Sequence, residues 1–364
     1  MNERVARLRG LLAEAGLDAL LVSDPYNRRY LSEFTGSAGY LLITRDESVI
    51  ATDFRYWEQA GQQCPDFRLH KAIGQAAEWF PPLVAPLGEK KLGFEQAHVT
   101  YQLHKVLRAA VDSLPAGQRP EMVPAEPLVE RLRAVKEPAE VDAMERVIAL
   151  GDAAFTYVAE RAEPGWTEKQ VAWEIERYIR EHGGEGLSFP TIVAGGAWGA
   201  LPHAYPRDYE LREGEGVVID MGALLDGYCS DMTRTIFLGR PDDQFRKIYD
   251  IVFVAQQAAA EAIESGMKGH DAHMVAQNVI EAAGYAENFQ HGLGHGSGLQ
   301  VHEAPRLGRN SSDVLQDGMV FSIEPGIYLP GWGGVRIEDL AVLESGRCRV
   351  LSKAPKLQFA GVGA

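Results

Sequence analysis

Four acidic side chains stand where the sequence predicts the ends of short β-strands, positions that normally carry uncharged residues. Asp220 closes the apolar run V-V-I-D, Asp231 opens a second run, Glu324 follows F-S-I and Glu338 follows G-V-R-I. A carboxylate that leaves water costs several kcal/mol unless it is paired or bound to a cation. Few basic residues lie between these acids. The four acids therefore predict a bound cation.

Three histidines lie within the 12 residues of H-G-L-G-H-G-S-G-L-Q-V-H, namely His291, His295 and His302. Glycines on both sides of His295 would let the backbone pack close to a metal or a substrate. Four carboxylates and one imidazole suit manganese, cobalt or zinc, and the absence of a cysteine cluster argues against a structural zinc. Two of the acids could bridge a pair of ions about 3.5–4 Å apart, an arrangement that activates water.

Two further residues could support such a site. Arg336 stands two residues before Glu338, on the same face of a predicted strand, where it could hold a ligand carboxylate; a solvent-facing arginine is the alternative. Thr235 could support Asp231 through a hydroxyl hydrogen bond. The turn L-L-D-G-Y would let the two aspartates face each other across a hairpin, and its D-G pair is turn chemistry outside the site.

A faint internal repeat indicates how two pairs of acids could meet. P-G-W-T and S-G-M-K each precede a predicted helix, so that Gly165 corresponds to Gly266 and Phe189 to Phe289, about 100 residues apart. Each half then ends in a predicted strand pair that carries two acids. A duplicated helix–helix–strand unit would bring the two acid pairs together.

The first part of the chain alternates helix and strand signals, which indicates a small α/β domain. Apolar residues recur at helical spacing from Val5 to Ala15, L-D-A-L-L-V-S, Y-L-L-I-T and V-I-A-T-D predict strands, and D-P-Y-N predicts a turn. Three prolines in G-Q-R-P-E-M-V-P-A-E-P disfavour both helix and strand. We therefore expect an amino-terminal domain over residues 1–125 and a second domain over residues 126–364.

Composition excludes several classes of partner. The formal net charge of −15 disfavours nucleic acid and anionic membranes. No apolar run approaches the about 18 residues of a membrane span, and the first residues are too charged for a signal peptide. Three widely spaced cysteines form no disulfide framework. The sequence predicts a cytoplasmic protein.

The segment from Val217 to Glu338 resembles the catalytic half of the pita-bread metallopeptidases, the family of methionyl aminopeptidases, aminopeptidase P and prolidase. The pieces F-T-G-S-A-G and T-D-F-R-Y resemble the creatinase-type amino-terminal domain of aminopeptidase P and prolidase, which methionyl aminopeptidases lack. The resemblance implies an α/β creatinase-type domain followed by an α+β catalytic domain with pseudo-two-fold symmetry. It also implies two divalent ions, manganese first, bridged by Asp231 and Glu338. The five ligands that it implies are Asp220, Asp231, His295, Glu324 and Glu338.

The family's motifs also imply roles for residues around the metals. His203, in A-L-P-H-A-Y-P, and His302 would contact the scissile peptide and stabilise its developing oxyanion. Glu324 would take a proton from the attacking water besides binding metal. His291 would line the substrate pocket together with His302.

The resemblance implies an aminopeptidase that releases an amino-terminal residue preceding proline, acting as a homodimer. The first alternative is a prolidase restricted to Xaa-Pro dipeptides, because Arg306 lies where prolidases place an arginine proposed to hold the substrate carboxylate. The second alternative is a non-catalytic binding protein on the same fold. Such proteins, and the metal-free enzyme creatinase, usually lose ligand residues, and none is missing here.

Overall fold

The computed structural model describes residues 2–357 of the chain. The chain divides into two compact units, of which the first ends at Arg133 and the second begins at Ala134. Each unit encloses hydrophobic core of its own. Within residues 2–357, none of the helices combines the length and the apolar character that a membrane span requires.

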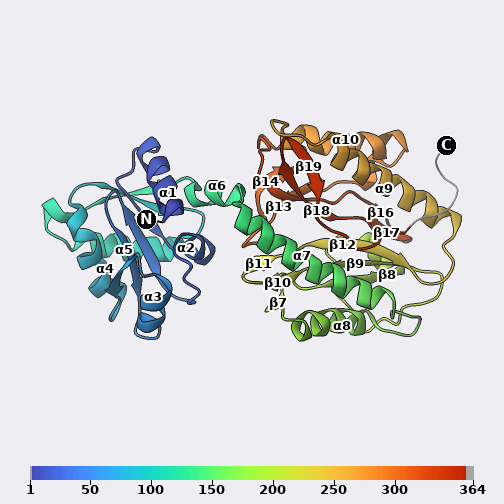
Figure 1. The fold of residues 1–364 in the computed structure, drawn as a ribbon, viewed down its shortest axis with the longest axis horizontal. Helices are drawn as coiled ribbons and strands as arrows, with labels where there is room; N and C mark the ends of the chain where they lie inside the picture. Colours follow the sequence, from blue (N-terminus) through green and yellow to red (C-terminus); the bar gives the residue numbers. More distant parts are fainter. Residues whose placement is uncertain (1, 358–364) are drawn as a thin grey trace. The chain divides into compact units, whose positions relative to one another are not determined.

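A six-stranded mixed sheet forms the centre of the first unit, in the order β4-β3-β2-β1-β5-β6 (Figure 1). β1 runs parallel to β5 and β5 parallel to β6, whereas β2 is antiparallel to both β1 and β3. The three strands predicted from the sequence are β1, β2 and β3, and all of β1 is buried. The strands are β1 (Ala19–Val22), β2 (Tyr40–Thr44), β3 (Ser48–Thr52), β4 (Arg68–Lys71), β5 (Lys91–Glu95) and β6 (Glu121–Ala125).

Helices connect these strands, and one of them replaces a predicted turn. D-P-Y-N begins the helix α2, because the Asp24 side chain accepts hydrogen bonds from the Tyr26 and Asn27 amides and Pro25 takes the first helical position. An aspartate cap followed by proline is a strong helix start, so the turn prediction was wrong. The helices are α1 (Glu3–Glu14), α2 (Pro25–Ser32), α3 (Trp57–Gln63), α4 (Ala76–Val84), α5 (Tyr101–Asp112) and α6 (Leu128–Ala134), with short 3₁₀ turns η1 (Ala85–Leu87) and η2 (Ala116–Gln118).

The proline-rich segment before the second unit also forms regular structure. Its residues Glu121–Ala125 are β6, which pairs with β5 alone and so lies at the edge of the sheet. Proline is tolerated in an edge strand because the missing N–H would face away from the sheet, and Pro124 is exposed there. The expectation that this segment lacks a strand was wrong. The domain boundary predicted after residue 125 lies at the end of β6, whereas the division between the two units follows Arg133, within the last turn of α6.

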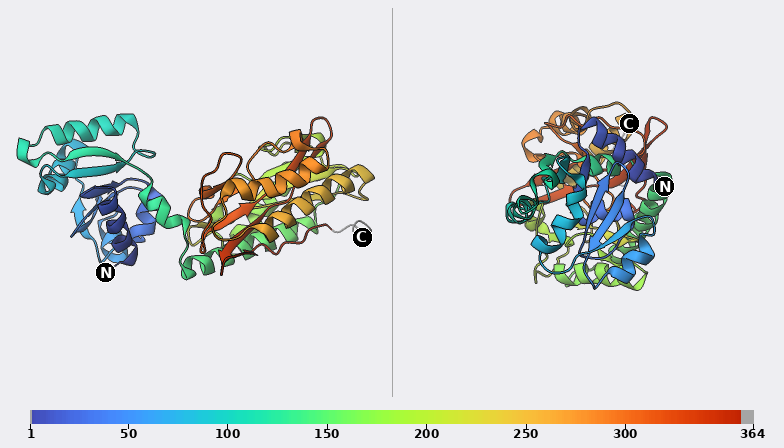
Figure 2. Two further views of the ribbon diagram at one scale, coloured as in Figure 1. Left: turned by 90° about the horizontal axis from the view of Figure 1, so that it is seen from above. Right: turned by 90° about the vertical axis from the view of Figure 1, so that its left-hand side faces the viewer.

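In the second unit, two helix pairs lie against strands. α7 and α8 share a core with β8, β9 and β12, whereas α9 and α10 share a core with β15 to β18. Figures 1 and 2 both show α9 and α10 side by side. The helices are α7 (Pro138–Ala159), α8 (Glu168–Glu181), α9 (Asp243–Ala262) and α10 (Gly269–Ala282), with η3 (Gly196–Ala200) and η4 (Ala286–Asn288).

Over residues 134–357, the strands of the second unit form four small sheets, in the orders β11-β10-β7, β12-β9-β8, β14-β13-β15-β18-β19 and β16-β17. They are β7 (Gly186–Leu187), β8 (Ile192–Gly195), β9 (Gly216–Met221), β10 (Ala223–Leu225), β11 (Tyr228–Cys229), β12 (Met232–Phe237), β13 (Gly294–Gly296), β14 (Glu303–Leu307), β15 (Val320–Ile323), β16 (Gly326–Leu329), β17 (Gly333–Arg336), β18 (Asp339–Glu344) and β19 (Arg347–Val350).

The predicted repeat has a structural counterpart in matching backbone hydrogen bonds. The Gly165 amide donates to the Leu211 carbonyl over 2.9 Å, and the Gly266 amide donates to the Leu315 carbonyl over 2.8 Å. In each half, the amide of the same leucine donates back to the residue after the glycine. Both glycines lead into the second helix of their half, α8 or α10. The duplicated helix–helix–strand construction is therefore present in the fold.

Candidate metal centre

The two aspartates come from the strand pair of the first half. Asp220 lies within β9 and Asp231 directly precedes β12, which is antiparallel to β9. The β10–β11 hairpin inserted between them turns at Asp226, whose φ of 52° is the left-handed conformation of a tight turn. Thr233 is consequently the cross-strand neighbour of Asp220. The two aspartates therefore lie at the same end of the strand pair without standing opposite each other.

The other three predicted ligands come from the second half. His295 is the central residue of β13, Glu324 follows β15, and Glu338 stands between β17 and β18. Ser322 joins the first two, because its Oγ accepts the His295 N–H over 3.1 Å and donates to Glu324 Oε1 over 3.2 Å. The glycine before His295 is required by close packing, since a Cβ on Gly294 would lie 1.9 Å from the Ser322 carbonyl oxygen.

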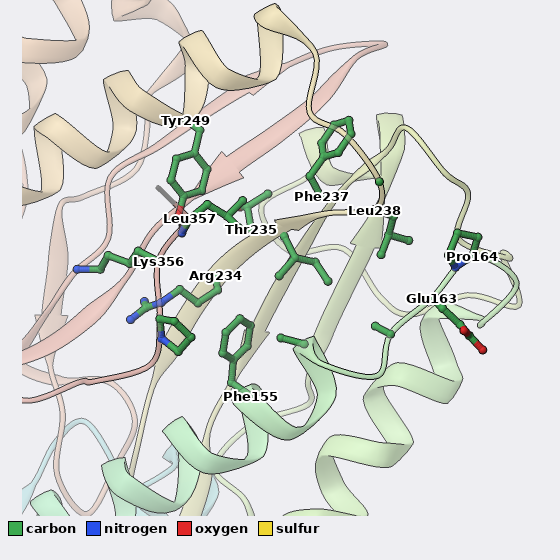
Figure 3. Close-up of a pocket in the computed structure, with 15 residues that line it drawn as sticks. Phe155, Glu163, Pro164, Arg234, Thr235, Phe237, Leu238, Tyr249, Lys356 and Leu357 are labelled. Carbon is green, nitrogen blue, oxygen red and sulfur yellow. Dashed lines mark hydrogen bonds between the residues drawn. The ribbon is translucent and has the colours of Figure 1, made fainter. Parts of the chain in front are cut away.

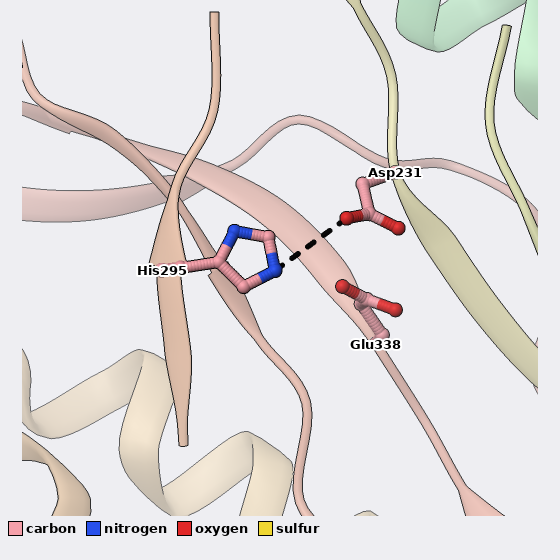
Figure 4. A group of neighbouring side chains, drawn as sticks. All are labelled: Asp231, His295 and Glu338. Carbon is pink, nitrogen blue, oxygen red and sulfur yellow. Dashed lines mark ion pairs between the residues drawn. The ribbon is translucent and has the colours of Figure 1, made fainter. Parts of the chain in front are cut away.

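Side chains from the two halves converge in the second unit. His295 Nε2 lies 3.6 Å from Asp231 Oδ2 and 3.4 Å from Glu324 Oε1. One possible ligand atom each from Asp231, His295 and Glu338 lies within 4.8 Å of the other two. Figure 4 shows the imidazole directed at the two carboxylates. Asp231 and Glu338 are buried, whereas His295 and Glu324 are partly buried.

A backbone contact defines which nitrogen of His295 faces the carboxylates. His295 Nδ1 lies 3.1 Å from the Gly296 carbonyl oxygen, which can only accept a hydrogen bond. Nδ1 therefore carries the proton in the neutral ring, and Nε2 presents its lone pair to Asp231 and Glu324. A carbonyl that fixes the tautomer in this way is typical of histidines that bind metal through the other nitrogen.

Asp220 reaches the cluster through Arg336. Arg336 Nη2 lies 2.6 Å from Asp220 Oδ2, and Arg336 Nε donates to Thr233 Oγ1 over 3.0 Å. Thr233 Oγ1 in turn donates to Glu338 Oε2 over 2.6 Å. Arg336 therefore binds a predicted ligand carboxylate, and Thr233 links this ion pair to Glu338.

Burial and mutual repulsion oppose the negative charge of the cluster. Burial raises the pKa of Asp231 and of Glu338 well above the usual range, and neighbouring carboxylates raise both further. Burial also raises the pKa of Glu324 to about 7, although the Arg336 charge acts against it. Burial lowers the pKa of His295, which keeps the imidazole neutral. Ionised carboxylates and neutral imidazole are the forms that bind metal, so a cation would relieve the repulsion.

The donor set fits a divalent cation. Asp220 Oδ1 is buried and has no hydrogen-bond partner among the residues that the structure describes, and a cation would satisfy it. Carboxylate oxygens with one imidazole suit manganese, cobalt or zinc. The residues that could hold such ions are Asp220, Asp231, His295, Glu324 and Glu338.

The remaining predicted histidines surround this cluster in different ways. The ring of His302 meets that of His295 edge to face, with centroids 4.3 Å apart, and His302 is exposed. His291 accepts the Tyr328 hydroxyl at Nε2 over 3.0 Å and donates from Nδ1 to the Gly292 carbonyl, so both nitrogens have protein partners. Burial lowers its pKa to about 4. His203 is exposed. A positive charge on its ring lowers the pKa of His291 and of His302, although burial is the larger cause for each.

Arg306 lies beside the cluster on the same sheet face as His295. The two residues are direct partners in the antiparallel pair β13–β14, and such partners project to one face. The Arg306 charge lowers the pKa of both His295 and His302, although burial is the larger cause for each. Its guanidinium is exposed and forms no ion pair with residues 2–357. The positively charged Arg306 side chain is therefore available next to the candidate site.

Thr235 does not support Asp231, contrary to the prediction. Its hydroxyl donates to the Arg336 carbonyl and accepts the Arg336 N–H, each over 3.1 Å. Thr235 also lines a cavity of about 330 Å³ with Phe155 of α7 and Tyr249 of α9 (Figure 3). Within the described chain, this cavity contains none of the five predicted ligands in its lining. The threonine whose hydroxyl contacts a predicted ligand is Thr233, which donates to Glu338.

Thr233, Ser322 and Tyr328 contact predicted site residues and were missed from the sequence. Thr233 and Ser322 each stand two residues from a predicted ligand, so strand periodicity could have placed them on the same face. Tyr328 bridges His291 and Arg336, which donates to its hydroxyl over 2.8 Å. Nothing in the sequence near Tyr328 indicates this contact, because it depends on the pairing of β16 with β17.

Comparison with known proteins assigns both units. Residues 4–135 match the Creatinase/Prolidase N-terminal domain, and residues 142–345 match Metallopeptidase family M24. A Xaa-Pro dipeptidase from Bacillus anthracis has a similar structure, with a TM-score of 0.93 and 39% identity over 98% of each chain. A Xaa-Pro dipeptidase from Pyrococcus horikoshii is 33% identical over 98% of each chain. An X-Pro aminopeptidase from Thermotoga maritima has a TM-score of 0.87 and 34% identity, covering 97% of this chain and 99% of its own.

These matches agree with the geometry of both units. The α/β first unit corresponds to the creatinase-type domain, and the duplicated second unit contains the converging acids and histidine. The expected fold class is thus confirmed. The chain belongs to metallopeptidase family M24, with a creatinase-type amino-terminal domain followed by a pita-bread catalytic domain.

Proposed function

We propose that the protein is an exopeptidase that hydrolyses the peptide bond preceding proline at the second position of its substrate. The convergence of Asp231, His295, Glu324 and Glu338 carries this proposal, since it supplies the ligands of a hydrolytic metal centre. The names of similar proteins support the substrate class, because both dipeptidases and an aminopeptidase directed at Xaa-Pro bonds share the fold over nearly the whole chain.

The residues of the chain would divide the work of hydrolysis. Divalent ions bound by the five ligands would polarise the scissile carbonyl and lower the pKa of water. Glu324, whose Oε1 is held by Ser322, would accept a proton from the attacking water and pass it to the leaving proline nitrogen. His203 and His302, which are both exposed, would donate hydrogen bonds to the oxyanion as it forms.

Arg306 favours dipeptides as substrates. It is exposed, lies opposite His295 and forms no ion pair within residues 2–357, so it could hold the carboxylate of a Xaa-Pro dipeptide. This placement gives the prolidase more support than the sequence alone. The aminopeptidase is the second candidate, supported by the similar structure from Thermotoga maritima.

Cleavage of Xaa-Pro and Xaa-Pro-Yaa peptides by the wild type and an Arg306→Ala variant decides between the two. For a dipeptidase, Arg306→Ala should raise KM for Xaa-Pro by about 10–100-fold, because a charge-assisted bidentate contact is lost. Arg347→Ala, which removes an exposed arginine of β19, is the matched control. Cleavage of tripeptides at least as efficient as that of dipeptides, with little effect of Arg306→Ala, would establish the aminopeptidase. Undiminished cleavage of both substrates by metal-free protein would refute the metallopeptidase mechanism.

The same proposal includes two ions per chain, manganese as the preferred metal, a homodimer and a cytoplasmic location. The four carboxylates support two ions and a hard-to-borderline metal. Metal analysis after dialysis should give about two equivalents of manganese, and a single equivalent at saturation would contradict the dinuclear site. Sedimentation of the full chain tests the dimer.

A further inference from the structure

One buried carboxylate joins the two ends of segment 195–207, the part of the chain that carries His203. Glu168, the first residue of α8, has no exposed side-chain surface. Its Oε1 accepts the Gly195 amide over 3.0 Å and its Oε2 accepts the Arg207 amide over 2.8 Å. These amides are the two ends of the segment. A single side chain therefore fixes both ends.

The Arg207 side chain completes this contact. Its Nη2 donates to Glu168 Oε1 over 2.7 Å and its Nε donates to Oε2 over 3.0 Å, which makes the pair bidentate. The guanidinium also lies 4.3 Å from the centroid of the Trp198 ring and 4.8 Å from that of Tyr209. Bidentate, charge-assisted bonds between planar groups are strong and restrict geometry. We call the contacts between Glu168 and residues 195 and 207 the Glu168 clamp.

Further contacts hold the middle of segment 195–207 together and pack it on β17. Trp198 Nε1 donates to the Tyr205 carbonyl over 3.2 Å, which ties the two sides of the segment together. η3 packs backbone to backbone on β17, since a Cβ on Gly334 would lie 2.1 Å from the Gly199 carbonyl oxygen. β17 ends at Arg336, which binds Asp220 and donates to the carbonyl of Pro202 over 3.4 Å. Pro202, the residue before His203, thus contacts Arg336, the partner of the predicted ligand Asp220.

We propose that Glu168 and Arg207 are positioning residues, which preorganise segment 195–207 and thereby hold the His203 imidazole at the candidate metal centre. The proposal rests on the proposed function, in which His203 stabilises the oxyanion. Among the described residues, neither of the two bonds to a ligand carboxylate, so any effect on catalysis passes through the segment. Catalytic groups need supporting contacts of this kind because misplacement by about 1 Å can cost about 10²-fold in rate.

A double-mutant cycle with His203 tests the proposal on the full-length, manganese-loaded protein. His203→Ala should lower kcat for a Xaa-Pro peptide by about 10²–10³-fold, as for one lost oxyanion donor. Arg207→Ala should lower kcat by about 10–100-fold with KM little changed. Arg207→Lys keeps the charge but not the bidentate geometry, so its kcat should fall less. The double variant His203→Ala/Arg207→Ala should be no slower than His203→Ala alone, because the imidazole that the Glu168 clamp positions is then absent. Lys169→Ala is the matched control, because it breaks the neighbouring exposed pair with Asp208 and should leave kcat unchanged.

Hydrogen exchange supplies a readout that does not depend on activity. Amides of residues 195–207 should exchange faster in Arg207→Ala, while the remaining amides, the melting temperature and the metal content stay close to the wild type. Losses in kcat that multiply in the double variant would overturn the proposal, and so would unchanged exchange in the segment. A wild type inactive on every Xaa-Pro peptide would instead refute the proposed function, and exchange would still test the clamp. Arg207 is partly exposed, so these variants should fold even where Glu168→Gln does not.

Discussion

Each of three carboxylates at the candidate metal centre is held by one neighbouring side chain. Thr233 donates to Glu338, Ser322 donates to Glu324, and Arg336 pairs with Asp220. Two of these neighbours are neutral hydroxyls, which orient a carboxylate without cancelling the charge that a cation needs. At the scale of single residues, the centre is therefore built to keep its oxygens in place while leaving much of their charge available.

Glu324→Gln separates proton transfer from metal binding. Glutamine keeps the size and one oxygen but cannot accept the proton, so kcat should fall by about 10²–10⁴-fold. The measurement is kcat on a Xaa-Pro peptide together with the metal content of the same sample. Glu344→Gln, at the exposed end of β18, is the control and should be fully active. Wild-type kcat in a metal-loaded Glu324→Gln protein would remove Glu324 from the mechanism.

Thr233→Val tests whether the hydroxyl at this position supports metal binding. The change leaves Glu338 Oε2 and Arg336 Nε without their shared partner, so manganese affinity should fall by about 10–100-fold. Calorimetric titration with manganese measures the effect. Thr233→Ser restores the hydroxyl and should bind nearly as tightly as the wild type. Thr235→Val should have the smaller effect, and the reverse order would favour the role first predicted for Thr235.

At the scale of elements, local signals predicted the helices and strands better than the contacts between them. The apolar spacing that begins at Val5 and the run at Ala19–Val22 each gave the correct element, because each reports burial of one face. D-P-Y-N was misread because its cap and its proline act together, and β6 was missed because edge position is not visible locally. The same limit applies to the site. The contact between Asp220 and Arg336 joins residues 116 positions apart, and strand periodicity predicted only that Arg336 could hold a ligand carboxylate, without indicating which one.

Helix α10 contains a buried histidine whose protonation should weaken the fold in acid. His273 is 0% exposed, and neither ring nitrogen has a hydrogen-bond partner within the described chain. Burial, with a smaller contribution from Arg309, lowers its pKa from 6.5 to about 4. Between these values the unfolded chain binds a proton that the folded chain does not, so stability is unaffected above pH 6.5 and falls as the pH decreases toward 4.

The pH dependence of unfolding in His273→Leu measures this contribution. At pH 5 the wild type should have lost on the order of 2 kcal/mol relative to pH 7 through this residue, and the variant should not show that part of the loss. Urea titrations with chelator present, at pH 7 and pH 5, give both values. His182→Leu, which removes an exposed histidine at the end of α8, should retain the full loss. Equal losses in the wild type and His273→Leu would show that His273 is protonated without cost.

At the scale of the whole molecule, the formal net charge of −15 includes buried carboxylates, two of which, Asp231 and Glu338, lie close together. The fold brings Asp231 and Glu338 together from separate halves, and burial with mutual repulsion disfavours their ionised forms. The duplicated architecture therefore costs stability at the point where its halves meet. Bound cations would offset this cost, so folding and metal binding should be coupled.

Chelation should abolish peptidase activity and lower the melting temperature, and manganese should restore both, because a ligand present at 100 times its Kd contributes about 2.7 kcal/mol.

An Asp231→Asn variant makes the test specific to repulsion within the cluster. It removes one of the facing charges, so in chelator it should be more stable than the wild type, by on the order of 1 kcal/mol. With manganese the order should reverse, because the variant has lost a ligand. Asp226→Asn changes an exposed turn aspartate and should match the wild type in both conditions. A chelated Asp231→Asn protein that melts below the chelated wild type would show that the aspartate stabilises the fold without a cation, and would contradict the coupling.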